Sequence, residues 1–140
     1  MIQKILVLCT GNSCRSQIAE GYLHYFLKDK AQIYSAGIET HGVNPRAIEI
    51  MKEDNIDISN QTSNNVDEYK NIDFDYVITV CDKEAADRCP VFPGMNKVIN
   101  WSFDDPSQFT GTLEKKVAKT RVVRDQIKEA VQGLIKTISS

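Results

Sequence analysis

The sequence predicts an α/β fold in which a four-stranded parallel β-sheet has helices on both faces. Short apolar runs of strand length alternate along the chain with segments whose apolar residues repeat at the helical period. Strands that are separated by helices form parallel sheets buried on both sides. The chain has 140 residues, 41% of them hydrophobic and 26% charged. We therefore expect a single domain over residues 1–140 with an ordinary hydrophobic core.

The first strand and the first helix lie close together in the sequence. Lys4–Cys9, "KILVLC", is predicted to be a buried strand because its apolar run is almost continuous. Arg15–Leu27 is predicted to be a helix because its apolar residues fall on one face. The residues of this face are Ile18, Ala19, Tyr22, Leu23, Phe26 and Leu27.

The next strand and helix are shorter. Gln32–Ser35 is predicted to be a strand that ends near Gly37. Asn44 and Pro45 mark the start of a second helix, since asparagine is a good N-cap and proline is favoured at the first helical position. Its apolar residues are Ala47, Ile48 and Met51.

The second half of the chain supplies two more strands and a long helix. Asp75–Cys81, "DYVITVC", is the clearest buried strand, and Lys97–Trp101 is the fourth. A final helix is predicted from apolar residues at the helical period. These residues are Val123, Ile127, Ala130, Val131, Leu134 and Ile138.

Composition excludes some classes of partner. The formal net charge of −2 gives no general attraction to nucleic acid or to an anionic membrane, so an anion site would have to be local. No stretch approaches the ~20 apolar residues of a membrane span, and no secretory signal precedes the first strand. We therefore expect a cytoplasmic protein with reduced, chemically active thiols. The four cysteines are Cys9, Cys14, Cys81 and Cys89.

The junction between the first strand and the first helix has the features of an anion site. Cys9 ends the predicted strand, and ligands of open parallel sheets bind beyond such ends. The N–H groups of the turn and the helix N-terminus attract an anion, and Arg15 can hold two of its oxygens. The same positive field favours the thiolate form of Cys9, to which Ser16 can donate a hydrogen bond. The expected oxyanion-binding residues are Thr10, Gly11, Asn12, Ser13, Cys14, Arg15 and Ser16.

Simpler interpretations of this stretch exist. A cysteine at the end of a buried strand is often only a small hydrophobic residue, and C-x5-R-S is a short pattern. The ATP-binding G-x4-G-K-[ST] motif does not occur in the sequence. The strand before the turn, the helix after it and Gly11 within it together favour a nucleophile, Cys9, in an anion site.

Several motifs resemble one enzyme family. "LCTGNSCRSQIAEG" resembles the active-site loop of the low-molecular-weight protein tyrosine phosphatases and, more specifically, of their relatives, the thioredoxin-coupled arsenate reductases. "YSAGIETHGVNPRAIEIMKEDNIDISNQTS" and "WSFDDP" also resemble the reductases, so the likeness covers nearly the whole chain. The resemblance implies the family's four-stranded parallel sheet flanked by helices.

The resemblance also implies a general acid. In this family the aspartate directly before a proline donates the proton, which corresponds to Asp105. An acid is useful because attack on a tetrahedral oxyanion must expel an oxygen. The simpler interpretation is that Asp105 and Pro106 begin a surface turn. Trp101 and Phe103 would either line the mouth of the site or pack in the core.

A relay of three thiols is implied by the likeness to the reductases. Cys9 attacks arsenate, Cys81 attacks the Cys9 sulfur so that arsenite leaves, and Cys89 then attacks Cys81. Thioredoxin would reduce the resulting disulfide, and phosphate or sulfate would mimic arsenate. Seven residues separate Cys81 from Cys89, one more than is usual in the family. Two unrelated cysteines beside a buried strand are the simpler interpretation.

The relay places a demand on residues 81–89. Eight helical steps would separate the Cα atoms of Cys81 and Cys89 by ~12 Å, whereas a disulfide requires ~4.4–6.8 Å. We expect a short helix in the reduced protein, stopped by Pro90, that bends or unwinds on oxidation. Amide exchange over this segment should then differ between the oxidised and the reduced protein.

Two further features complete the expected site. Cys14 either packs beneath the loop or forms a protective disulfide with Cys9. Some reductases of this type bind potassium through an asparagine, a glutamate, a serine and an aspartate. The first three are matched here by Asn12, Glu20 and Ser35. Asn64 stands where the aspartate would fall, which weakens the case for the ion, and no cofactor is expected to be required.

We therefore expect an arsenate reductase that uses its own thiols. The resemblance implies thioredoxin as the reductant, whereas glutathione with glutaredoxin, or mycothiol, would leave the earlier steps unchanged. The first alternative is a low-molecular-weight protein tyrosine phosphatase, which needs only Cys9, Arg15 and Asp105. The second is a non-enzymatic thiol sensor that changes shape on oxidation. Neither nucleic acid nor a membrane is an expected partner.

Overall fold

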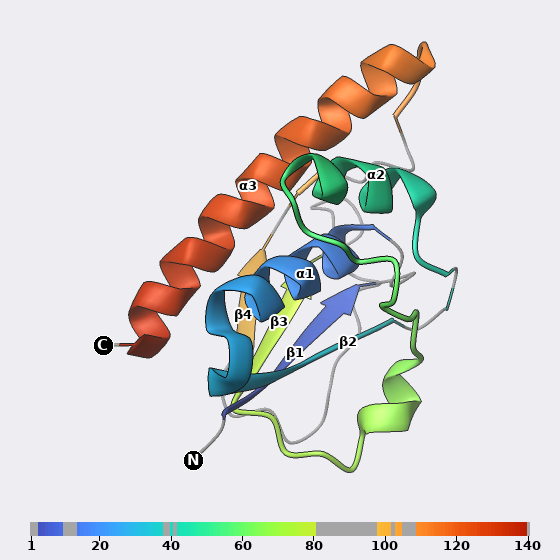
Figure 1. The fold of residues 1–140 in the computed structure, drawn as a ribbon. Helices are drawn as coiled ribbons and strands as arrows, with labels where there is room; N and C mark the ends of the chain where they lie inside the picture. The colour runs from blue at the N-terminus through green and yellow to red at the C-terminus, as the bar shows by residue number, and fades with distance from the viewer. Residues whose placement is uncertain are drawn as a thin grey trace.

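The computed structural model describes residues 3–9, 14–37, 40, 42–80, 98–101, 103–104 and 109–139. From β1 to β3, strands and helices alternate along the chain as the sequence predicts (Figure 1). The elements are β1 Gln3–Cys9, α1 Arg15–Leu27, β2 Ala31–Gly37, α2 Pro45–Glu53, β3 Tyr76–Val80, β4 Val98–Trp101 and α3 Leu113–Ser139. Two short 3-10 helices are η1 Lys28–Lys30 and η2 Val66–Tyr69.

The four strands form one parallel sheet in the order β2-β1-β3-β4. The predicted four-stranded parallel sheet is therefore confirmed. β2 extends beyond the predicted strand at both ends, because its pairing with β1 continues as far as Cys9 opposite Gly37. β1 and β3 have mostly buried side chains, which explains why they are continuous apolar runs in the sequence.

β1 is an inner strand of the sheet, with β2 on one side and β3 on the other. The chain first proceeds through α1 to β2 and later returns to β3 on the opposite side of β1. The carboxyl end of β1 is thus a topological switch point, where open α/β sheets bind their ligands. Because the strands are parallel, the ends at Cys9, Val80 and Trp101 lie at the same edge of the sheet.

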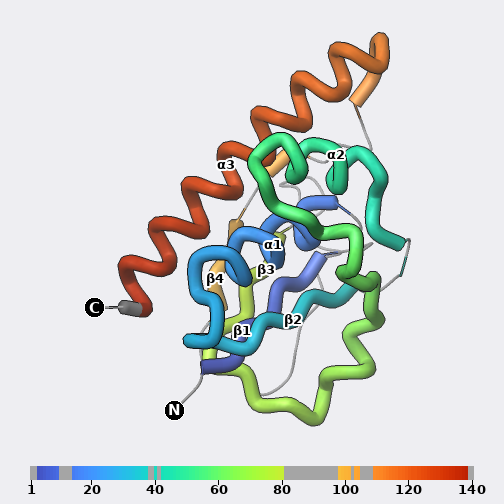
Figure 2. Tube along the Cα trace, in the orientation of Figure 1, coloured from blue at the N-terminus to red at the C-terminus, as the bar shows by residue number. Residues whose placement is uncertain are grey.

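Helices α1 and α3 lie on one side of the sheet (Figures 1 and 2). Apolar side chains of that face, among them Val7 and Ile78, form one buried cluster with residues of α1, α2 and α3. The other face packs against the segment from η2 to Phe74. There the Tyr34 ring lies edge-to-face against Tyr69 and Phe74, with centroids 5.2 and 5.3 Å apart. Among the described residues, α-helices thus cover one face, and the 3-10 helix η2 with the chain up to Phe74 covers the other.

α1 is buried on more sides than its sequence pattern predicts. The predicted apolar face is buried except at Phe26, which is half-buried, but Gln17, Glu20 and Gly21 are buried as well. A Cβ atom at Gly21 would lie 2.7 Å from Cγ2 of Ile58. The segment after α2 therefore covers a side of α1 that polar residues led us to expect at the surface.

The remaining helices agree with their predictions. The Asn44 side chain accepts a hydrogen bond from the Arg46 backbone N–H (2.8 Å), and Pro45 is the first residue of α2. On α3, the side chains of Val123, Ile127, Val131 and Leu134 are buried, whereas those of Ala130 and Ile138 are half-buried. Within the described ranges, no helix is both long and apolar enough to cross a membrane.

Candidate active site

Cys9 and Arg15 lie at the junction between β1 and α1. Cys9 is the last residue of β1, is 4% exposed and carries a free thiol. Arg15 is the first residue of α1 and is 6% exposed. A buried strand and a buried helix therefore position the two residues that we predicted to attack and bind an oxyanion.

Arg15 also contacts the segment that follows β4. Its Nη1 donates a hydrogen bond to the backbone carbonyl oxygen of Phe103 (3.2 Å). The Phe103 ring lies against Trp101, with ring centroids 6.2 Å apart. Both rings are partly buried against the main apolar cluster, so they have the core-packing role that the sequence left open. The hydrogen bond connects the β1–α1 junction to Phe103, the residue directly before Asp104.

Cys14 and Ser16 flank Arg15 at the start of α1. Cys14 is 7% exposed and belongs to the main apolar cluster. This burial favours the packing interpretation of Cys14 over a protective disulfide with Cys9. Ser16 is fully buried in the first turn of α1. Both residues precede or follow Arg15 directly at the start of α1.

Several predicted site residues lie outside the described residues. They are Thr10, Gly11, Asn12, Ser13, Cys81, Cys89 and Asp105. The described residues include Val80, which precedes Cys81 at the end of β3, and Asp104, which precedes Asp105. Leu8 of β1 pairs with Thr79 of β3, so Cys9 and Val80 end adjacent strands at the same level.

Glu20 and Ser35, two of the residues predicted to bind potassium, contact each other. The Ser35 hydroxyl donates a hydrogen bond to Glu20 Oε1, and Glu20 Oε2 lies 3.3 Å from Nε2 of His24. Asn64 Nδ2 donates to the Ser35 carbonyl oxygen (3.4 Å). Sequence reasoning did not connect His24 to this group, although the i, i+4 spacing of Glu20 and His24 on a helix is a signal for it.

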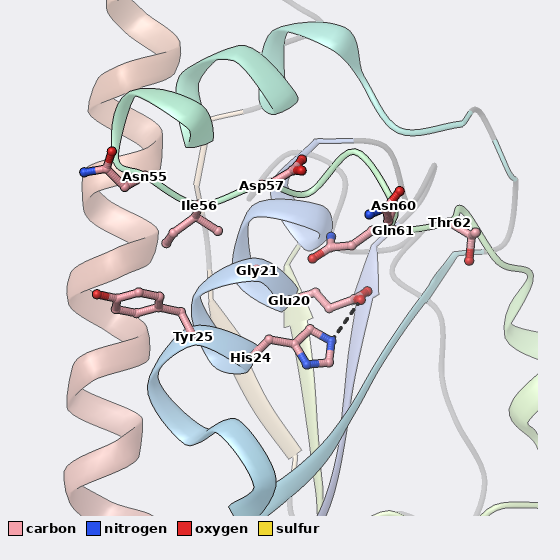
Figure 3. Close-up of a pocket in the computed structure, with 10 residues that line it drawn as sticks. All are labelled: Glu20, Gly21, His24, Tyr25, Asn55, Ile56, Asp57, Asn60, Gln61 and Thr62. Carbon is pink, nitrogen blue, oxygen red and sulfur yellow. Dashed lines mark hydrogen bonds and ion pairs between the residues drawn. The ribbon is translucent and has the colours of Figure 1, made fainter.

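A pocket of about 550 Å³ opens beside Glu20 and His24 (Figure 3). Its walls are α1 and the segment 55–62. The lining residues are Glu20, Gly21, His24, Tyr25, Asn55, Ile56, Asp57, Asn60, Gln61 and Thr62. Across the described part of the chain, no group of three or more His, Cys, Asp or Glu side chains is arranged to hold a metal ion.

Two glutamines hold one wall of this pocket against α1. Gln61 Nε2 donates to Gln17 Oε1 (2.8 Å) and to the Gln17 carbonyl oxygen (3.0 Å). Gln17 Nε2 in turn donates to the carbonyl oxygen of Thr62 (3.0 Å). The sequence analysis missed this pair because no local pattern relates residues that are 44 positions apart.

Known proteins resemble this chain over nearly its whole length. Two relatives, the arsenate reductases of Halalkalibacterium halodurans and Bacillus subtilis, are each 49% identical over 133 residues, which cover 95% of this chain and of each relative. A solved structure, "An arsenate reductase in the phosphate binding state", has a TM-score of 0.83 at 34% identity and covers 98% of this chain and 99% of its own. A family model described as low molecular weight phosphotyrosine protein phosphatase matches residues 4–140. The chain belongs to the low molecular weight phosphotyrosine protein phosphatase family.

Proposed function

We propose that this protein is an arsenate reductase in which Cys9 is the nucleophile. The observation that carries the proposal is the 49% identity to two arsenate reductases over 95% of the chain. The geometry supports it, since the free thiol of Cys9 ends β1 at the switch point and Arg15 begins α1. Arsenate is a tetrahedral oxyanion like phosphate. The similar solved structure is of an arsenate reductase in the phosphate binding state.

The reaction begins with attack of the Cys9 thiolate on the arsenic atom of arsenate. A sulfur–arsenic bond forms, and one arsenate oxygen leaves as water after Asp105 has donated a proton. Arg15 and the start of α1 bind the remaining oxygens and stabilise their negative charge. Arsenic stays pentavalent in this step.

Reduction occurs when the Cys81 thiolate attacks the Cys9 sulfur. The sulfur–arsenic bond breaks, its electron pair stays on arsenic, and arsenite leaves while Cys9 and Cys81 form a disulfide. Cys89 then attacks Cys81, which releases Cys9 and leaves a Cys81–Cys89 disulfide for thioredoxin to reduce. The position of Val80 level with Cys9 supports this order. Such a cycle needs a reducing compartment, so we place it in the cytoplasm.

A potassium ion, if bound near the loop, would be held by Asn12, Glu20 and Ser35. The contacting carboxylate of Glu20 and hydroxyl of Ser35 are oxygen ligands of the kind that hard cations prefer. Asn64 adds no carboxylate to the set, although a neutral amide oxygen can also ligate a cation. Its Nδ2 faces the Ser35 carbonyl oxygen, and its Oδ1 accepts a hydrogen bond from the Thr62 hydroxyl (3.0 Å). We infer that the reaction does not require the ion.

Replacement of Cys81 tests the proposed relay. The wild-type protein should oxidise reduced thioredoxin over many turnovers in the presence of arsenate, which is followed through NADPH consumption by thioredoxin reductase. Cys81→Ser should stop this turnover because the Cys9 adduct can no longer be resolved. Hydrolysis of p-nitrophenyl phosphate should survive, since it needs only Cys9, Arg15 and Asp105.

The two alternative functions predict different results. A protein tyrosine phosphatase, favoured by the description of the family model, would hydrolyse phosphotyrosine and show no arsenate-dependent turnover. A thiol sensor would be oxidised once and would consume no more than one equivalent of reductant. Mass mapping of disulfides after a single arsenate turnover should identify a Cys81–Cys89 bridge, and its absence would contradict the relay.

A further inference from the structure

The hydrogen bond between Arg15 and Phe103 joins parts of the chain that are 88 positions apart. Nη1 of Arg15 lies 3.2 Å from the Phe103 carbonyl oxygen, and Arg15 as a whole residue is buried. A buried charge is costly unless it is hydrogen-bonded. The carbonyl oxygen therefore helps to keep a charged arginine in this position before any anion binds.

The hydrogen bond to the Phe103 carbonyl oxygen is made by Nη1 of the Arg15 guanidinium. A guanidinium has five N–H donors in a fixed plane, and bidentate binding of an oxyanion uses two of them. The bond at Nη1 restricts rotation of this plane about the last side-chain torsions. Less conformational entropy is then lost when an anion binds, which is the physical basis of preorganisation.

The ring of Phe103 determines where its carbonyl oxygen lies. Phe103 follows β4 closely, and its ring packs at 66° to that of Trp101, the last residue of the strand. Both rings also pack against the main apolar cluster. The ring thereby fixes the backbone at residue 103, and with it the point from which the chain continues to Asp104.

We propose that Phe103 is a positioning residue that orients the Arg15 guanidinium for oxyanion binding through its backbone carbonyl. The inference rests on the proposed function, which makes Arg15 the oxyanion-binding side chain. It goes further because the packing of Phe103 against Trp101 at the end of β4 would then affect how tightly the site binds an oxyanion. The same contact gives the segment leading to Asp104 a defined position relative to Arg15.

Phosphate binding by the full-length, reduced protein tests the proposal. Phosphate is a suitable probe because thiols do not reduce it, so calorimetric titration measures binding without turnover. Phe103→Ala should weaken phosphate binding about tenfold, which corresponds to ~1.4 kcal/mol and to the partial loss of one hydrogen bond to a charged group. Phe103→Leu, which retains an apolar side chain of similar reach, should restore most of the affinity.

Phe109→Ala is the matched control. Phe109 is also partly buried against the main apolar cluster, where Lys119 Nζ lies 5.7 Å from the centroid of its ring. This variant should bind phosphate within about twofold of wild type, the scatter expected for an independent site. Circular dichroism and thermal melting check the fold of each variant, and Phe103→Val replaces Phe103→Ala if the alanine variant does not fold.

A double-mutant cycle separates positioning from a general loss of packing. Phe103→Ala should weaken phosphate binding much less in an Arg15→Lys background, because the fixed guanidinium plane is already lost. Equal effects of Phe103→Ala in both backgrounds, or an affinity matching that of Phe109→Ala, would overturn the proposal alone. Unchanged phosphate affinity in Arg15→Lys itself would overturn both this inference and the role of Arg15 in the proposed function.

Discussion

The first two turns of α1 carry four buried polar residues, which are Arg15, Ser16, Gln17 and Glu20. Burial of such groups is unfavourable unless they are hydrogen-bonded. Arg15 donates to the carbonyl oxygen of Phe103, Gln17 donates to that of Thr62, and Glu20 accepts from the Ser35 hydroxyl. Each bond leads to a different part of the chain. The polar side of α1 therefore connects the segments that surround the candidate site.

Gly21 of α1 lies close to α2 and to the segment that follows it. A Cβ atom there would be 2.7 Å from Cγ2 of Ile58 and 3.0 Å from Cε of Met51, both in buried side chains. We predict that Gly21→Ala lowers the free energy of unfolding by about 1–2 kcal/mol, because overpacking outweighs the better helix propensity of alanine. Urea denaturation of the two proteins measures this difference.

Gly133 provides the matched control for this substitution. It is an exposed glycine inside α3, and no atom lies within 4 Å of the position that its Cβ would occupy. Gly133→Ala should therefore raise the free energy of unfolding by about 0.5–1 kcal/mol. If both substitutions stabilised the protein, the close contact at Gly21 would be wrong.

At the scale of elements, charged pairs join the end of α2 to α3. Both Glu53 carboxylate oxygens accept hydrogen bonds from Arg121, at 2.8 and 2.9 Å. Asp54 Oδ2 accepts from Lys128 Nζ (2.9 Å) and from the Tyr22 hydroxyl of α1 (2.8 Å). The bond from Lys128 is the main reason that the pKa of Asp54 is lowered. Burial, followed by the bond to Asp54, raises the pKa of Tyr22.

This lowered pKa predicts a pH-dependent contribution of Asp54 to stability. Because the folded-state pKa lies below the unfolded-state value, the contribution is complete above the latter, about 4, and disappears as pH falls through the folded-state value. Asp54→Asn should therefore lower the free energy of unfolding by about 1 kcal/mol at neutral pH and by progressively less in acid. Urea denaturation across this pH range measures the effect.

Lys128→Gln identifies the origin of the effect. Asp54→Asn and Lys128→Gln should be non-additive at neutral pH, because each removes one member of the same charged pair. An acid-independent effect of Asp54→Asn, or full additivity of the two substitutions, would mean that the pair does not stabilise the contact between the helices.

At the scale of the whole molecule, the candidate anion site combines three parts of the fold. Cys9 belongs to β1, Arg15 to α1, and Phe103 follows β4 at the far side of the sheet. The chain must bring β1 and β3 together and add β4 beside them before these groups can meet. An anion bound there is held by the folded state and not by the unfolded chain, so its binding should stabilise the whole fold.

Phosphate should therefore raise the melting temperature of the reduced protein. At a concentration of about 100 times its dissociation constant, the stabilisation should reach ~2.7 kcal/mol. Differential scanning calorimetry with increasing phosphate measures it. The rise should be much smaller in Arg15→Lys, which also reports any nonspecific effect of the salt, and an equal rise in both proteins would contradict binding at Arg15.

Much of the fold could be predicted because its signals are local. β1 and β3 are apolar runs, α2 begins at an Asn-Pro pair, and α3 has a regular apolar face. The same holds for the pair of Cys9 and Arg15, since a thiol at a strand end and an arginine at a helix start are close in the sequence. The burial of Glu20 and Gly21 could not be predicted, because it depends on the segment after α2 that packs against α1.

By itself, the sequence determined the succession of strands and helices along the chain, the parallel sheet, and the position of Cys9 at a strand end and of Arg15 at a helix start. Each of these follows from periodicity, capping or spacing over a few residues. Only the tertiary structure decided that the Phe103 carbonyl meets Arg15 and that Gln61 meets Gln17. These contacts join residues 88 and 44 positions apart, and such pairs are brought together by the packing of whole elements rather than by any local pattern.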